Sequence, residues 1–141
     1  MNIFDLINAD FANITSRVTV AEGCGFIIVG ADSPQYLAES DHQRNEGQAY
    51  RRAANKGEVP KVDTETEEGQ KVFQERLQAN LTATAIACTV GWFGFTDASG
   101  ADVPFDPALL AQMFAKKRAW RDAVISALDE DARFLPQPAA A

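Results

Sequence analysis

The pattern of apolar and polar positions predicts a β-hairpin near the start of the chain. Residues 17–20 alternate polar and apolar side chains, whereas residues 26–29 are continuously apolar. A glycine-containing turn at 22–25 separates the two runs, which is typical of a hairpin. We therefore predict a hairpin over residues 17–30, and we expect its second strand to be covered on both faces because that strand lacks alternation. Apolar positions between residues 3 and 11 predict one or two turns of helix before it.

The next part of the chain predicts a long, mostly polar helix followed by a loop. Residue 32 or 33 provides an N-cap and Pro34 suits the first helical position, so the helix should run from there to about Lys56. Its few apolar residues predict a helix that is exposed over much of its length. Residues 58–69 are acidic and contain few large apolar side chains, and we predict a flexible loop there.

The clearest pattern in the chain is the apolar run that leads to residue 90. Apolar or small side chains recur at intervals of three or four and become almost continuous over residues 81–90, which predicts a helix that is buried at its C-terminal end. We expect Gly91 to end this helix, and we place the core of the protein at its buried end. The principal stripe consists of Phe73, Leu77, Leu81, Thr84 and Cys88.

Two further helices are predicted in the last third of the chain. An acidic turn at 97–100 precedes Asp106 and Pro107, which suit the N-cap and the first position of a helix. A last helix is expected from about Ala119. After it, we expect Phe134 to pack back on the fold and residues 136–141 to fray.

Together these elements predict a mainly α fold with a small N-terminal β-hairpin, in the α+β class, with about four to five helices. The helical part spans residues 33–135. A chain of 141 residues is long enough for one domain with a substantial core, so we assign residues 1–135 to a single domain.

Charge and hydrophobicity narrow the classes of partner. The chain has 13 Lys and Arg against 20 Asp and Glu, for a net charge of −7. Binding to a phosphate backbone needs concentrated cations, so we predict no nucleic-acid partner. The longest apolar run is about ten residues, roughly half of what a membrane-spanning helix requires, and we predict no membrane partner.

Residue types that carry catalysis are sparse. The single histidine, His42, lies in a polar run on a predicted exposed helix, without the nucleophile and carboxylate that a hydrolase needs. Together with Cys24 and Cys88 it supplies too few ligands for a metal site, and no glycine pattern typical of phosphate or dinucleotide binding occurs. The basic run 116–118 beside Trp120 suits an anion, but it equally complements the dipole at a helix C-terminus. We therefore expect no enzyme activity, no catalytic residue, no cofactor and no metal.

Several segments, taken in order along the chain, are similar to a known family. They are the strand-to-helix junction 30–36, the helix end 89–92, the acidic turn 97–100, the capped helix start 103–107, and then Trp120 and Phe134. With these features in this order, residues 26–135 resemble the small tail assembly chaperones of long-tailed bacteriophages.

The resemblance implies a non-enzymatic protein that acts in the cytoplasm of the infected bacterial host. Its partner would be the long, helical tape measure protein of the phage, which such chaperones keep soluble until the tail tube polymerises around it. Self-association is compatible with the same role. Two other functions stay open: a virion structural component, such as a connector or tail-completion protein, and a small acidic inhibitor of a host protein.

The candidate partner-binding residues are aromatic side chains in the second half of the chain. They offer more aromatic surface than a small core requires, and apolar grooves between helices are the usual binding sites for helical partners. Ordinary core packing is the alternative for each of them. The six candidates are Trp92, Phe93, Phe95, Phe105, Phe114 and Trp120.

Overall fold

A three-stranded antiparallel sheet forms the base of the molecule. The computed structural model describes residues 2–136, and in it the strands β1 (Thr15–Ala21), β2 (Cys24–Val29) and β3 (Thr89–Phe93) lie in the order β1-β2-β3. The first two strands are the predicted hairpin. With five α-helices among the described residues, the α+β class predicted from the sequence is confirmed.

Strand β3 corrects the prediction that the apolar run up to residue 90 is helical to its end. The preceding helix ends at Cys88, two residues earlier than expected, and Thr89 already has an extended backbone. The Thr89 hydroxyl donates to the Ala85 carbonyl at 2.7 Å and closes the helix end. The β-branched pair at 89–90 favours a strand over a helix, and pairing with β2 decides between them.

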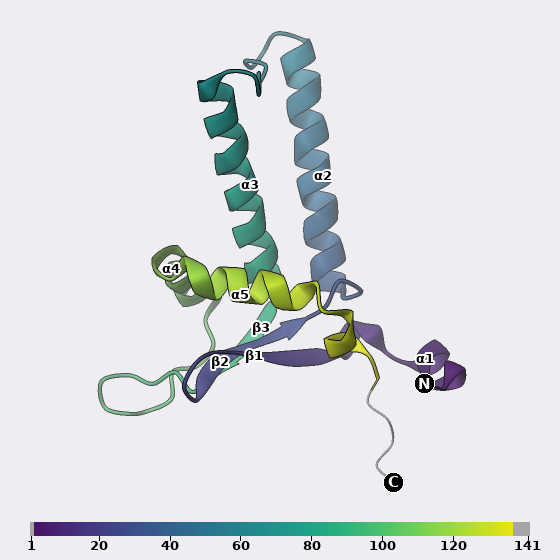
Figure 1. The fold of residues 1–141 in the computed structure, drawn as a ribbon, viewed down its shortest axis with the longest axis vertical. Coiled ribbons are helices and arrows are strands. Elements are labelled where there is room, and N and C mark those ends of the chain that lie inside the picture. Colours follow the sequence, from purple (N-terminus) through teal and green to yellow (C-terminus); the bar gives the residue numbers. More distant parts are fainter. Residues whose placement is uncertain (1, 137–141) are drawn as a thin grey trace.

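Two long helices rise from the sheet as an antiparallel hairpin, the arm. They are α2 (Pro34–Asn55) and α3 (Glu67–Cys88), and Figure 1 shows them standing side by side above the sheet. The buried Ser33 hydroxyl accepts a hydrogen bond from the Tyr36 amide at 3.2 Å, as predicted for an N-cap at the start of α2.

The turn between these helices is shorter than the loop predicted at 58–69. Helix α3 begins at Glu67, where the Thr66 hydroxyl accepts from the Gly69 amide at 3.0 Å. A Cβ at Gly69 would lie 1.7 Å from the Asp63 carbonyl oxygen, so only glycine fits this close approach. The last three residues of the predicted loop therefore belong to a helix.

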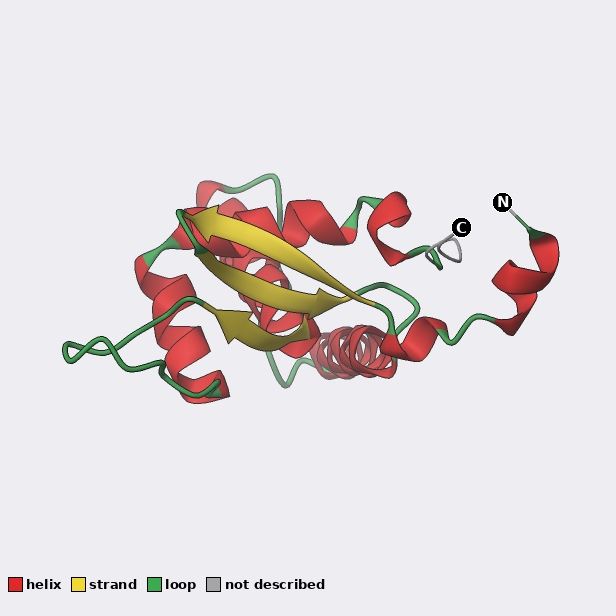
Figure 2. Ribbon diagram, turned by 90° about the horizontal axis from the view of Figure 1, so that it is seen from below, coloured by secondary structure: helices red, strands yellow, loops and turns green. Residues whose placement is uncertain are grey.

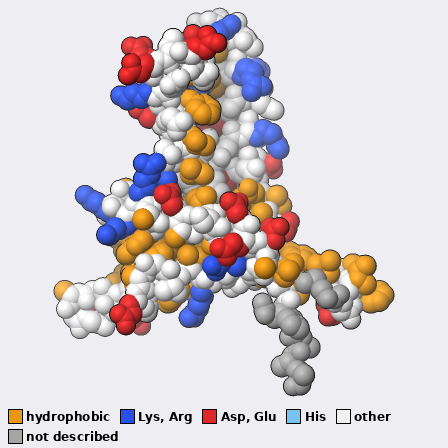
Figure 3. Space-filling view, viewed as in Figure 1, with side chains coloured by type: hydrophobic (Ala, Val, Ile, Leu, Met, Phe, Trp, Pro, Cys, Tyr) orange, Lys and Arg blue, Asp and Glu red, His pale blue; other side chains and the backbone are white. Residues whose placement is uncertain are grey.

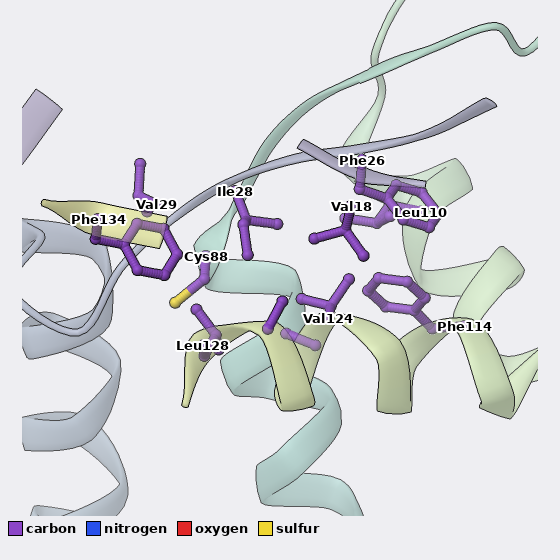
Figure 4. Packing of buried hydrophobic residues seen from close by; sticks show 12 residues of the cluster. Val18, Phe26, Ile28, Val29, Cys88, Leu110, Phe114, Val124, Leu128 and Phe134 are labelled. Carbon is purple, nitrogen blue, oxygen red and sulfur yellow. The ribbon is translucent and has the colours of Figure 1, made fainter. Parts of the chain in front are cut away.

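Two shorter helices cover one face of the sheet and close the core. They are α4 (Pro107–Lys116) and α5 (Arg118–Leu128), and both begin near the positions that the sequence predicts. Figure 4 shows Phe26 and Ile28 of β2 pointing toward Phe114 and Val124 of these helices. Within the described part of the chain, the other face of the sheet carries no helix, as Figure 2 shows from below. The expected cover on both faces of β2 is therefore only partly present, although Val29 is buried.

Hydrogen bonds between side chains join α3 to α5 and to α2. The buried Arg121 of α5 donates to the Gln78 Oε1 of α3 at 2.7 Å and to the Thr82 hydroxyl at 3.2 Å. On the other side, the Gln43 amide of α2 donates to the Thr84 hydroxyl at 3.0 Å. These hydrogen bonds fix the base of the arm against the helical layer.

The two ends of the chain pack differently. The predicted helix near the start is α1 (Ile3–Asn8), followed by a 3₁₀ turn at Phe11–Asn13, and no residue of α1 is buried. Near the other end, a 3₁₀ turn at Asp131–Phe134 brings Phe134 back onto the core, as predicted. The predicted fraying at 136–141 falls, from residue 137 on, outside the described residues. None of the helices within residues 2–136 combines the length and the apolar character that crossing a membrane requires.

We expect Cys88 to be unreactive in the folded protein. Its thiol is fully buried, and its pKa is raised from 9.0 to about 11. Desolvation is the main cause, and the negative charge of Glu39 adds to it. Because only the thiolate is nucleophilic, an alkylating reagent at pH 8 should modify at most the half-buried Cys24 in the native protein and both thiols after denaturation. Mass spectrometry of the labelled chain checks this, and rapid native labelling of Cys88 would contradict its burial.

Candidate partner-binding groove

An open apolar groove lies between β3, the loop that follows it, and the helices α4 and α5. Its volume is about 400 Å³. We call it the aromatic groove. Its walls are formed by Trp92, Phe95, Thr96 and Val103 on one side and by Leu109, Gln112, Met113, Lys116, Lys117 and Trp120 on the other.

Edge-to-face aromatic contacts build the sheet side of the groove. The Trp92 ring lies 5.6 Å from the Phe95 ring and 5.1 Å from the Phe105 ring, both at steep angles. Its indole N–H donates to the Val103 carbonyl at 2.8 Å, so the polar atom of the side chain is satisfied. Trp92 is therefore held rigidly with one part of its ring in the core and another facing the groove.

A short β-bridge holds the loop that completes this wall. Thr96 pairs with Asp102 across the acidic turn at 97–100, which agrees with the turn predicted there. Asp97 accepts from the Ser99 hydroxyl at 2.6 Å and from the amides of Ser99 and Ala101. These hydrogen bonds hold the pKa of the Asp97 carboxyl below its usual value, and the bond from the Ser99 side chain contributes most. The turn keeps Val103 in place opposite Trp92.

Helix α4 supplies the other wall and a positively charged rim. Asp106 caps the helix by accepting from the Ala108 amide at 2.9 Å. Leu109 and Met113, one turn apart, face the groove, and Leu109 is 37% exposed. Lys116 and Lys117 lie at the C-terminal end of α4, where cations also complement the helix dipole. No carboxylate is among the lining residues.

The structure divides the six aromatic candidates into four sets. Trp92, Phe95 and Trp120 line the groove, and Phe95 and Trp120 lie 5.8 Å apart. Phe105 supports Trp92 from behind, and Phe114 is a core residue with 2% exposure.

Phe93 lies on the opposite face of the sheet from the groove, because side chains alternate along a strand. There the Arg17 guanidinium lies 4.8 Å from the centre of its ring. Phe93 is therefore not part of the groove.

Sequence reasoning missed part of the lining. Leu109 and Leu110 are apolar neighbours at the start of α4, yet only Leu110 is buried and Leu109 faces the groove. Val103 and Gln112 were not expected to share a site with the aromatic residues, whereas the sequence already placed Lys116 and Lys117 beside Trp120. The spacing of Leu109, Met113 and Lys116 along one helix face is the signal that points to them.

A second apolar strip runs along the arm, where Phe73 and Leu77 of α3 remain 49% and 41% exposed. Figure 3 shows hydrophobic side chains rising between the two helices and gathering near α4 at the base. The cleft around this strip has a volume of about 520 Å³ and mixes apolar side chains with asparagines and cations. In it, the Arg76 guanidinium lies 3.8 Å from the centre of the Tyr50 ring.

Groups suited to chemistry are not gathered in the groove. His42 lies on the exposed surface of α2, with Nε2 3.2 Å from a Glu46 carboxylate oxygen. Among residues 2–136, no three side chains of His, Cys, Asp or Glu are close enough together to hold a metal ion. The arrangement of the groove suits apolar contact with a partner.

Comparison of the chain with protein-family models, with curated proteins and with solved structures found no match in any of the three.

Proposed function

We propose that this protein is a tail assembly chaperone of a long-tailed bacteriophage. In this proposal it binds an apolar helical segment of the tape measure protein in the aromatic groove, in the cytoplasm of the infected bacterium. The observation that carries the proposal is an open apolar groove walled by three aromatic side chains, Trp92, Phe95 and Trp120, and rimmed by two lysines.

Some of the residues that carry the family resemblance lie at this groove, which supports the proposal, whereas the junction 30–36 and Phe134 lie elsewhere in the fold. Trp92, Val103 and Trp120 line the groove, and Phe105 packs behind Trp92. The acidic turn holds the loop between the first two of these residues. Segments that are far apart in the sequence thus contribute to one surface, as expected where a shared pattern serves binding.

The physics of helix recognition also supports it. An amphipathic helix binds by placing side chains from successive turns into an apolar groove, and the partner aggregates when those side chains face water. The aromatic groove accepts such side chains, and the exposed strip on the arm offers further apolar surface. The net charge of −7 keeps a chaperone with exposed apolar surface dispersed.

Co-expression with the tape measure protein encoded by the same phage tests this proposal. The soluble fraction of the tape measure protein should rise when the chain is present and should fall back when it is omitted. Purified tails should lack the chain. An unchanged soluble fraction under matched expression would contradict the proposal, and a fixed copy number of the chain in finished tails would favour a virion structural component instead.

A further inference from the structure

Helix α1 presents an apolar surface that the rest of residues 2–136 leaves exposed. None of its residues is buried, and Ile3, Phe4 and Ile7 are 61%, 68% and 68% exposed. Figure 1 places α1 beyond the edge of the sheet, away from the packed helices. Isolated helices shorter than about 12 residues are marginal in water, so a six-residue helix depends on a surface against which it can pack.

Charge points to the kind of surface that α1 fits. Residues 2–16 contain Asp5 and Asp10 and no Lys or Arg. A segment without cations is not attracted to an anionic membrane, where interfacial helices carry Lys and Arg on their polar face. An apolar surface with a positively charged rim complements both the apolar side chains and the negative charge of this segment.

The aromatic groove has both properties. Its lining is mostly apolar, Lys116 and Lys117 form its rim, and it contains no carboxylate. The cleft of the arm also contains cations, but asparagines interrupt its apolar lining. A six-residue helix is about 9 Å long, which matches a short groove better than the length of the arm.

The position of α1 in the fold separates it from the aromatic groove of its own chain, so only the groove of a second copy is open to it. Figures 1 and 2 both place α1 and α4 at opposite ends of the sheet, so α1 is remote from the groove of its own chain. Two copies that lie side by side in antiparallel orientation bring each α1 to the groove of the other. The contact is then made twice and closes in a symmetric dimer.

We propose that α1 docks in the aromatic groove of a second copy, with Asp5 toward Lys116 and Lys117 and with the apolar side chains of α1 against Trp92 and Trp120. The dimer covers both apolar surfaces at once. If the proposed function holds, α1 and the tape measure protein, which is then the client, compete for one groove. Binding of the client converts the dimer into a complex that contains a single copy of this chain. This last consequence rests on the proposed function, whereas the dimer does not.

A charge-swap experiment with full-length chains tests the dimer. One variant carries Asp5→Lys and the other carries Lys116→Glu with Lys117→Glu. All three positions are exposed, so both variants should fold. In each variant alone, α1 and the groove carry like charges, and the dimer should weaken at least tenfold, which corresponds to about 1.4 kcal/mol for the dimer as a whole. In an equimolar mixture the heterodimer pairs opposite charges in both contacts, and association should return.

Sedimentation velocity from about 1 to about 200 µM measures the association, a range that covers micromolar dissociation constants. Wild type should reach twice its chain mass of 15.3 kDa. The emission of Trp92 and Trp120, the only tryptophans in the chain, should shift to shorter wavelength as the dimer forms. Charge reversal at Glu58, exposed in the turn of the arm, is the control and should leave the dimer intact.

Three results would overturn the dimer: a wild-type chain that stays monomeric over the whole range, variants that associate like wild type, or a mixture that associates no better than its components. The test is separate from that of the proposed function. Asp5→Lys leaves the groove unchanged, so this variant should still raise the soluble fraction of the tape measure protein even though its dimer is weakened.

Discussion

Phe26→Ala should lower the free energy of unfolding by about 3–5 kcal/mol, because it removes a large side chain from the centre of the core. Phe26 has 0% exposure, and its ring lies 5.3 Å from that of Phe114, 5.5 Å from that of Phe95 and 6.2 Å from that of Trp120. It thus joins the sheet to α4 and to the back of the groove. Thermal unfolding should show a Tm lower by roughly 10–20 °C.

Phe93→Ala is the matched control for this prediction. Phe93 lies on β3, directly beside β2, but it is only half-buried and packs on the helix-free face of the sheet. Its replacement removes the Arg17 contact and some apolar area, at a cost of about 1–2 kcal/mol. Equal loss of stability in the two variants would show that the core does not lie between the sheet and α4 and α5.

If the proposed function holds, Leu109→Glu should abolish the rise in soluble tape measure protein, the client of the proposed chaperone, while leaving the fold intact. The substitution places a carboxylate in the wall of the aromatic groove, where a bound helix would bury it without a partner, at a cost of several kcal/mol. Leu109 is the third residue of α4 after the Asp106 cap, a position at which glutamate is favourable. The Tm should therefore stay within a few degrees of wild type, while, under the proposed function, the soluble fraction of co-expressed tape measure protein falls to that seen without this chain.

Leu37→Glu provides the same chemical change outside the groove. Leu37 is 53% exposed in the first turn of α2, and it lines neither the groove nor the cleft of the arm. This variant should solubilise the client as well as wild type does. If Leu109→Glu also solubilises the client fully, the groove is not the binding surface, and the strip of Phe73 and Leu77 on the arm becomes the site to test.

The elements with local signals could be predicted from the sequence. Gly23, with a φ of +72°, marks the turn of the hairpin between two β-prone runs. The starts of α2 and α4 each combine a capping side chain with a proline at the first helical position, Ser33 with Pro34 and Asp106 with Pro107. These signals depend on a few neighbouring residues, so they can be read without knowledge of the rest of the fold.

Strand β3 could not be predicted in the same way, because its choice of structure is not local. Residues 89–90 continue an apolar run that suits a buried helix, and their β-branched side chains alone do not decide against it. The register with β2, which sets Trp92 opposite Phe26, makes the strand preferable. The missing strand also explains why Phe93 was grouped with Trp92 as a candidate. Alternation along β3 puts these two neighbours on opposite faces of the sheet.

The composition of the groove could be predicted only in part. Large aromatic residues can be chosen as binding candidates from the sequence alone, and three of the six candidates line the groove. Whether an aromatic ring faces the core or the groove depends on packing between elements that are distant in sequence, as the full burial of Phe114 shows. The sequence places Lys116 and Lys117 beside Trp120, but their position on the rim of the groove depends on the same tertiary arrangement.

The central claim is that the aromatic groove binds the tape measure protein. Hydrogen exchange of the chain, measured with and without added tape measure protein, tests this claim most directly. If the aromatic groove holds the client, protection should increase in residues 92–96 and in the peptides of α4 and the start of α5, while β1 and the uncovered face of the sheet remain unchanged. Binding that leaves the exchange of α4 unaltered, or protection confined to the arm or to β1, would contradict a client site in the groove.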